Sequence, residues 1–182
     1  MRELDALLTL LPLERLPRTG WILAGVAAPE SVAAHSFGSA LVALALGPGV
    51  EPPLDVDRAV SLALVHDAPE ALLGDIPRGG AELLPADAKR TAEGRGFEAL
   101  LGPLSELALD RGLEFHAGET REARFARLCD KLQLGVRLIG YVRAGERNLR
   151  DFRAGLEALE CAEFPPCEAL RVAVLRALDE VD

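Results

Sequence analysis

The segment ETREARFARLCDKLQLGVRLIGYVRAG, residues 119–145, is the longest periodic stretch of the chain. Apolar residues recur in it at helical spacing, so it predicts a long helix, for which Thr120 is a plausible N-cap. Apolar residues make up 49% of the sequence but aromatic residues only 4%, so the core must consist mostly of Leu, Ala and Val. A composition this poor in β-branched and aromatic residues favours helices over sheet, and we expect an all-α fold.

Other apolar segments predict further helices that are separated by turns. We place them at residues 2–11, from Ser31 to about Leu46, from Asp55 or Asp57 through AVSLALVHDAPEALL, from Pro85 or Ala86 to Leu101, and at 103–111, 148–160 and 166–180. Pro69 should kink or end its helix. Residues 16–29 and 74–80 are rich in Pro and Gly and predict loops. The 182 residues fit one domain, 1–182, of six to nine helices.

The charge pattern limits the classes of partner. The net charge is −9 and no cluster of Lys and Arg forms a continuous basic surface, so long nucleic acid is not an expected partner. A small anionic substrate remains compatible with this charge if a metal ion supplies local positive charge. The N-terminus does not read as a signal peptide, and no segment approaches a membrane-spanning length of uninterrupted apolar residues. We therefore expect a cytoplasmic protein that does not enter a membrane.

Two histidines and two aspartates are candidate metal ligands. His35 and His66 lie in apolar segments, where a single histidine is more often a hydrogen-bonded core residue. Asp67 directly follows His66, and a metal ion would explain a carboxylate in these surroundings, because buried charges need a partner. Asp130 supplies a fourth candidate, although alone it would be interpreted as a surface residue paired with Arg127 or Lys131. The set suits one divalent ion such as Mn, Fe, Co, Ni or Zn, with Mg also possible.

The order His, His-Asp, Asp resembles the signature of the HD-domain phosphohydrolase superfamily. Four local segments, RTGW at 18–21, PESVAAH at 29–35, LALVHDAPEALLGDIP at 62–77 and EARFARLCDKLQ at 122–133, resemble its 5′-deoxynucleotidase branch, which includes YfbR-like and HD-domain-containing protein 2-like enzymes. The resemblance covers residues 16–145, with the helices of 148–180 following. It implies an all-α HD domain, a metal held by His35, His66, Asp67 and Asp130, and hydrolysis of nucleoside 5′-monophosphates with deoxy substrates preferred.

The resemblance also assigns roles around the metal. Glu70 matches the catalytic acid/base position, and on a continuing helix it would share a face with His66 and Asp67. It could position or deprotonate the attacking water, or protonate the departing ribose 5′-oxygen. Arg18 and Trp21 match the loop that meets the nucleotide, with core or lid packing as the alternative for Trp21. Asp75 matches a sugar-contacting position, and the alternative is that it caps the turn at Gly74.

Two other functions fit the same residues. One is an HD phosphohydrolase that acts on another nucleotide or a small phosphate ester, and the other is a catalytically silent binding module stapled by a metal. The C-terminal segment CEALRVAVLRALDEV offers an apolar face for a homodimer, although a monomer that packs its own core would use the same pattern.

Overall fold

A computed structural model of the chain describes residues 2–181, and in this range it contains helices, turns and one isolated bridge between Pro17 and Ser31 but no strand. The all-α expectation is therefore confirmed. In chain order the helices are α1 (Arg2–Leu10), η1 (Leu11–Glu14), α2 (Thr19–Leu23), α3 (Val32–Leu46), η2 (Gly47–Gly49), α4 (Val56–Val65), α5 (Glu70–Leu73), α6 (Arg78–Ala81), α7 (Ala88–Leu101), α8 (Glu106–Ala117), α9 (Arg121–Arg143), α10 (Arg150–Glu157) and α11 (Pro165–Asp179).

Eight of the helices within residues 2–181 have eight residues or more, which is within the expected range. The short helices α2 and α6 are corrections, because both lie in segments predicted as loops. Each has about one turn, which is too short for a hydrophobic period to appear in the sequence. For α2, the first amide, that of Thr19, donates to the Asp75 carboxylate.

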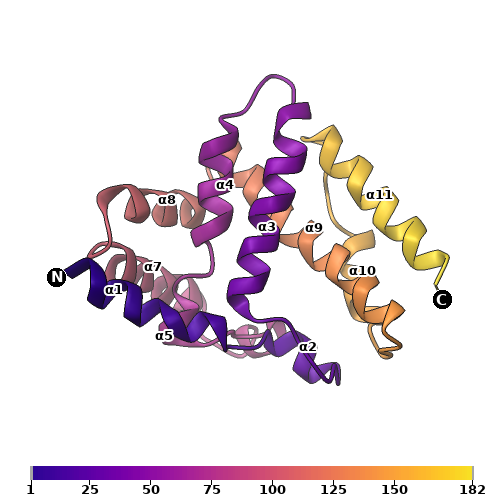
Figure 1. Cartoon of the computed structure of the whole chain (residues 1–182), viewed down its shortest axis with the longest axis horizontal. Coiled ribbons are helices and arrows are strands. Elements are labelled where there is room, and N and C mark those ends of the chain that lie inside the picture. Colours follow the sequence, from indigo (N-terminus) through magenta and orange to yellow (C-terminus); the bar gives the residue numbers. More distant parts are fainter. Residues whose placement is uncertain (1, 182) are drawn as a thin grey trace.

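Helices α3, α4 and α9 form the centre of the molecule. Figure 1 shows α3 and α4 side by side, joined by the loop at the top of the view, and both pack against α9. The predicted caps are confirmed, since Ser31 Oγ accepts from the amide of Ala34 and Asp55 Oδ1 accepts from the amide of Arg58. Small side chains such as Ala40, Ala43, Ala59, Ala63 and Ala126 are fully or almost fully buried in the apolar cluster between these helices. Their size allows the helices to approach closely.

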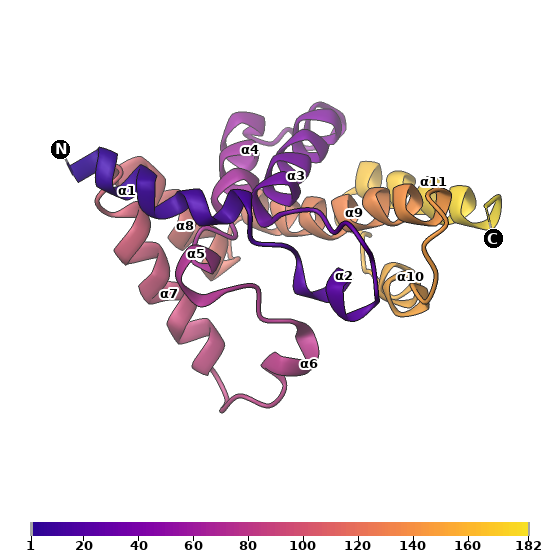
Figure 2. The ribbon, with the colours of Figure 1, turned by 60° about the horizontal axis from the view of Figure 1, so that its bottom comes forward.

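The remaining helices cover the two ends of α9. A second apolar cluster around Trp21, Tyr141 and Val174 joins α2 and the C-terminal half of α9 to α10 and α11. The apolar face of α11 therefore packs within the chain. This agrees with the interpretation that a monomer uses this pattern to pack its own core. At the other end, α7 and α8 pack together and α1 lies against α7. In Figure 2, α2 and α6 lie on the same side of the molecule, below α3 and α9.

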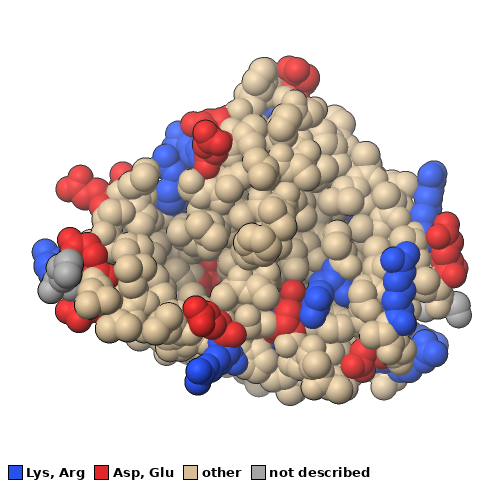
Figure 3. Space-filling model, in the orientation of Figure 1, with Lys and Arg blue, Asp and Glu red and all other residues tan. Residues whose placement is uncertain are grey.

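Helix α3 bears on the expectation that no segment has a membrane-spanning length of uninterrupted apolar residues. The segment Val32–Gly49 is long and apolar enough to cross a membrane by length and composition, with a mean hydropathy of 1.3 over 18 residues. Core helices have the same properties, and α3 packs against both α4 and α9. Its other face exposes Phe37, Leu41 and Leu44, and Figure 3 shows few charged side chains over the middle of this face.

Candidate metal centre and substrate loop

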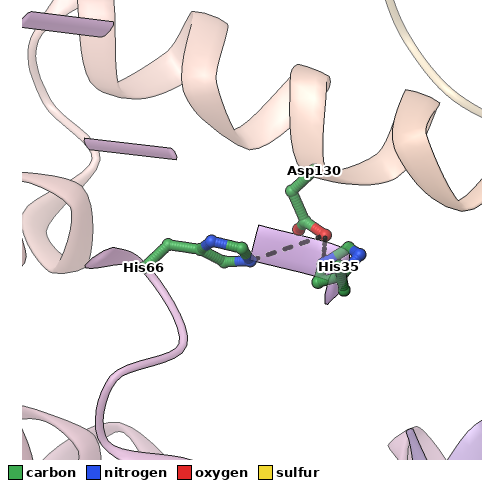
Figure 4. A group of neighbouring side chains, drawn as sticks. All are labelled: His35, His66 and Asp130. Atoms are coloured by element: carbon green, nitrogen blue, oxygen red, sulfur yellow. Dashed lines mark hydrogen bonds and ion pairs between the residues drawn. The ribbon is translucent and has the colours of Figure 1, made fainter. Parts of the chain in front are cut away.

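The four candidate ligands lie together in the structure. His35 comes from α3, Asp130 from α9, and His66 and Asp67 from the turn after α4. His35 Nε2 is 2.9 Å from Asp130 Oδ1 and 3.7 Å from Asp67 Oδ2. His66 Nε2 is 3.1 Å from Asp67 Oδ2 and 3.9 Å from Asp130 Oδ1. Figure 4 shows His35, His66 and Asp130 converging on one point, and one potential ligand atom from each of them lies within 4.8 Å of the others.

A break in the backbone delivers His66 and Asp67. Helix α4 ends at Val65. If the helix continued, the ring of Pro69 would clash with the carbonyl of Val65, four residues earlier. The chain continues in tight turns, with the amide of Ala68 donating to Val65 O and that of Glu70 to Asp67 O. The expectation that Pro69 kinks or ends its helix is therefore confirmed, and α5 starts anew at Glu70. The condition of a continuing helix, under which Glu70 would share a face with His66 and Asp67, is not met.

Hydrogen bonds to both imidazoles suit a metal ion. His66 Nδ1 lies 2.7 Å from its acceptor Ala63 O, and His35 Nδ1 lies 2.5 Å from Gln133 Oε1. In the neutral rings these contacts place the hydrogen on Nδ1, so each Nε2 lone pair faces carboxylate oxygens. Lone pairs that face one another repel unless a proton or a metal ion lies between them. His66 Nε2 is also buried without a hydrogen-bond partner, as expected for an atom suited to a divalent ion.

Positive side chains border the two carboxylates. Arg18 Nη1 lies 2.9 Å from Asp67 Oδ2, and Lys131 Nζ lies 2.9 Å from Asp130 Oδ2. Burial favours the neutral acids, but His66 and Arg18 outweigh it at Asp67 and hold the pKa of that carboxyl well below its usual range. Lys131 and His35 likewise lower the pKa of Asp130. Both aspartates are therefore anionic at neutral pH.

Glu70 differs from these aspartates. Burial, together with the negative charges of Asp67 and Asp75, raises the pKa of Glu70 to about 9. Its Oε2 atom is buried and has no hydrogen-bond partner. The Glu70 carboxyl is thus protonated at neutral pH in the metal-free protein and lies close enough to Asp67 to respond to its charge. A carboxyl of this kind is suited to proton transfer.

A loop from Leu16 to Ser31 carries Arg18 to the site. Its two ends are held together by the amide of Arg18, which donates to Glu30 O, and the amide of Val32, which donates to Leu16 O. The start of α2 is tied to Asp75, whose Oδ2 accepts from the Thr19 amide at 2.5 Å while its carbonyl accepts from Thr19 Oγ1 at 2.8 Å. Asp75 therefore caps α2 in this structure.

Trp21 packs inside the protein and is only 1% exposed. Its ring stacks on Phe152 of α10 with centroids 3.9 Å apart, and it meets Tyr141 edge-on at 4.9 Å. Its Nε1 atom donates to Glu30 Oε1 at 3.2 Å. The side chain thus anchors the loop that carries Arg18, in agreement with the packing alternative.

The sequence alone predicts no site role for Gln133 or Lys131. For Glu30 it leaves two interpretations open, which are that it lines the pocket or that it pairs with an arginine. Glu30 Oε2 lies 3.7 Å from Arg137 Nε and accepts from Gln133 Nε2. One available signal was spacing, because Gln133 follows Asp130 by three residues and so shares its helix face. The contact between Glu30 and Gln133 crosses 103 residues of sequence and leaves no local pattern.

Known proteins are similar to this chain in sequence and in fold. The family described as HD domain matches residues 12–158. The 5′-deoxynucleotidase HDDC2 of Xenopus laevis is 32% identical over 77% of this chain and 70% of its own length, and that of Bos taurus is 35% identical over 67% and 59%. This chain thus spans less than two thirds of the cattle protein. The crystal structure of PH0347 from Pyrococcus horikoshii OT3 superposes with a TM-score of 0.82, 31% identity, and coverage of 96% and 99% of the two chains. The chain belongs to the HD-domain family.

Proposed function

We propose that the protein is a metal-dependent 5′-nucleotidase that hydrolyses deoxynucleoside 5′-monophosphates to a nucleoside and phosphate. The observation that carries the proposal is the convergence of His35, His66, Asp67 and Asp130 beside Glu70, whose Oε2 atom is buried without a hydrogen-bond partner. The relatives named 5′-deoxynucleotidase support the substrate class.

In this proposal the four converging residues hold one divalent ion, whose identity stays open among Mn, Fe, Co, Ni, Zn and Mg. A bound divalent ion lowers the pKa of a coordinated water and withdraws charge from phosphate oxygens. Arg18 and Lys131, which border the two aspartates, place further positive charge where the phosphate would lie. Phosphate carries up to two negative charges, and a guanidinium matches the geometry of its oxygens.

Glu70 acts in the proposal as the general acid. A protonated carboxyl at neutral pH can donate its proton to the departing ribose 5′-oxygen as the P–O bond breaks. The charge of a bound divalent ion opposes the raised pKa, but burial, which is the largest cause of the shift, remains. Transfer of this proton avoids release of an alkoxide, which is a poor leaving group.

Asp75 and Trp21 act through the loop. The Asp75 carboxylate has several acceptor positions, so its bond from Thr19 leaves capacity for a sugar hydroxyl. Direct stacking of Trp21 on a base would require the side chain to leave its place against Phe152. We therefore assign Trp21 the role of holding the Arg18 loop.

The test is phosphate release from deoxy- and ribonucleoside 5′-monophosphates with Mn²⁺, Co²⁺, Ni²⁺ or Mg²⁺. We expect deoxy substrates to be preferred, and Glu70→Gln to lower kcat about 10²–10⁴-fold, the usual contribution of general acid–base catalysis. Metal affinity should be unchanged, and the fall of wild-type kcat at alkaline pH should be absent from the variant.

Each contrary result has a distinct meaning. Near-normal turnover by metal-loaded Glu70→Gln would overturn the role of Glu70. Hydrolysis confined to other phosphate esters would favour the broader phosphohydrolase alternative. A metal-loaded wild-type protein that hydrolyses none of these substrates would favour the binding module.

A further inference from the structure

A buried chain of hydrogen bonds leads away from the metal centre. His35 Nδ1 contacts Gln133 Oε1 at 2.5 Å, and Gln133 Nε2 donates to Glu30 Oε2 at 3.0 Å. The other Glu30 oxygen, Oε1, accepts from Trp21 Nε1 at 3.2 Å. Gln133 and Glu30 are each 7% exposed, so water does not compete freely for these groups. We name this set, from His35 through Gln133 to Glu30, the relay.

The hydrogen bonds of the relay allow only one assignment of donors and acceptors. The indole N–H of Trp21 can only donate, so Glu30 Oε1 accepts from it, while Glu30 Oε2 accepts from Gln133 Nε2 and lies 3.7 Å from Arg137 Nε. Gln133 must therefore turn its amide NH₂ group toward Glu30 and its Oε1 atom toward His35. An oxygen in that position requires a hydrogen on His35 Nδ1, so the neutral ring keeps its lone pair on Nε2.

The backbone of α3 makes room for this amide. A Cβ atom at Gly38 would lie 2.8 Å from Gln133 Cγ and 2.9 Å from Gln133 Nε2, closer than side chains tolerate. Gly38 follows His35 by three residues, so both lie on the face of α3 that meets α9. The absence of a side chain at this position is a second observation, independent of the hydrogen bonds, that the helices are fitted around Gln133.

His66 is held by a different device. Its Nδ1 atom lies 2.7 Å from the carbonyl of Ala63, three residues earlier in the same segment. Substitutions at Gln133 or Glu30 should leave this local contact intact. His66 is therefore an internal reference against which a change at His35 can be measured.

We infer that Gln133 and Glu30 are positioning residues that fix the tautomer of His35, so that its Nε2 lone pair faces the metal site. The inference deepens the proposed function and rests on the ligand role of His35. Because Glu30 also binds Trp21, the same carboxylate sets the orientation of His35 and the place of the Arg18 loop.

The first test is Gln133→Met, which keeps the length of the side chain but removes the acceptor. The protein has three histidines, so ¹⁵N NMR of the metal-free protein can follow each ring. We expect the hydrogen of His35 to move from Nδ1 to Nε2, where Asp130 Oδ1 still lies 2.9 Å away as an acceptor, while His66 stays unchanged. Titration with Co²⁺ alone should give a dissociation constant raised about 10–100-fold, the usual effect of losing a partner of a metal-binding histidine.

An exchange of the two side chains provides the rescue. In Glu30→Gln alone, the new amide has one oxygen for two donors, the indole N–H of Trp21 and the amide NH₂ of Gln133. Its own NH₂ group must therefore face one of these donors, and the relay is broken. In Glu30→Gln with Gln133→Glu, the amide at 30 can accept from Trp21 and donate to the carboxylate at 133, which accepts from His35. The double variant should therefore recover the His35 tautomer and Co²⁺ affinity to within a few-fold of wild type, whereas each single variant should not.

Tyr141→Phe is the matched control. The Tyr141 hydroxyl accepts from the backbone amide of Glu30 at 2.7 Å, so its loss should lower stability without changing the donors and acceptors of the relay. The melting temperature should fall while the His35 tautomer and Co²⁺ affinity stay close to wild type. This separates control of the tautomer from general loosening of the core.

Two results would overturn the inference. One is a folded Gln133→Met protein with an unchanged His35 tautomer and a Co²⁺ dissociation constant within two-fold of wild type. The other, decisive if Gln133→Met does not fold, is a folded double variant that binds Co²⁺ no better than Glu30→Gln alone. A wild-type protein that shows the expected tautomer and binds Co²⁺ but hydrolyses no nucleotide would instead refute the proposed function and leave the relay standing.

Discussion

The ligand side of the site, His35, His66, Asp67 and Asp130, and its loop side, Arg18, Thr19 and Asp75, are held by different kinds of structure. On the ligand side, His35 and Asp130 project from helices of 15 and 23 residues that pack against each other in the core, and His66 and Asp67 lie in the turn that directly follows α4. The loop side depends on the five-residue helix α2 and on hydrogen bonds between two loops. Groups that must hold an ion need rigid supports, while groups that admit and release a substrate are usually found on loops.

The largest expected effect comes from removing a ligand. His66→Ala should abolish tight Co²⁺ binding and lower nucleotide hydrolysis by about 10³-fold or more, because several kcal/mol of transition-state stabilisation depend on the metal. His116→Ala, a change of the same kind outside the site, should leave both measurements near wild type. Metal-supported activity close to normal in His66→Ala would contradict the ligand role of His66, and with it the difference between the ligand side and the loop side.

Arg18→Gln should act on the loop side alone. It removes a charged donor to the phosphate, so we expect KM for the nucleotide to rise about 10–100-fold, in line with the worth of a hydrogen bond to a charged group. Co²⁺ affinity should change little, since Arg18 is not a ligand. Arg15→Gln, an exposed position in the same segment, is the control. A large loss of Co²⁺ affinity in Arg18→Gln would instead make Arg18 part of the ligand side.

Thr19→Val should have the smallest effect. It keeps the shape of the side chain but loses the hydrogen bond from Thr19 Oγ1 to Asp75 O, worth about 1 kcal/mol. We expect a rise of a few-fold in KM with kcat unchanged, as measured by steady-state kinetics. Thr9→Val removes a comparable hydroxyl bond on the exposed face of α1 and should change neither constant. A fall in kcat without a change in KM would contradict the loop-side role.

The sequence predicted the ligand side better than the loop side. The HD motif and the apolar periods of α3 and α9 indicate which residues meet, because long helices place side chains at regular intervals. The single turns α2 and α6 were missed, since one turn has no visible period. The break before Glu70 was only partly foreseen, although Pro69 marks it. The relay could not be found, because His35 and Gln133 lie 98 residues apart and their contact depends on how α3 crosses α9.

The two histidines differ in how far their orientation depends on the rest of the protein. The orientation of His66 is fixed by the carbonyl of Ala63, three residues earlier. A short segment that contains both residues would therefore keep this orientation when grafted into another protein. The orientation of His35 depends on a glycine on the same helix, an amide on a second helix and a carboxylate on a loop. Transplanting this centre into a designed helical scaffold would therefore fail if only the ligands were copied. Gly38, Gln133 and Glu30 would have to move with them.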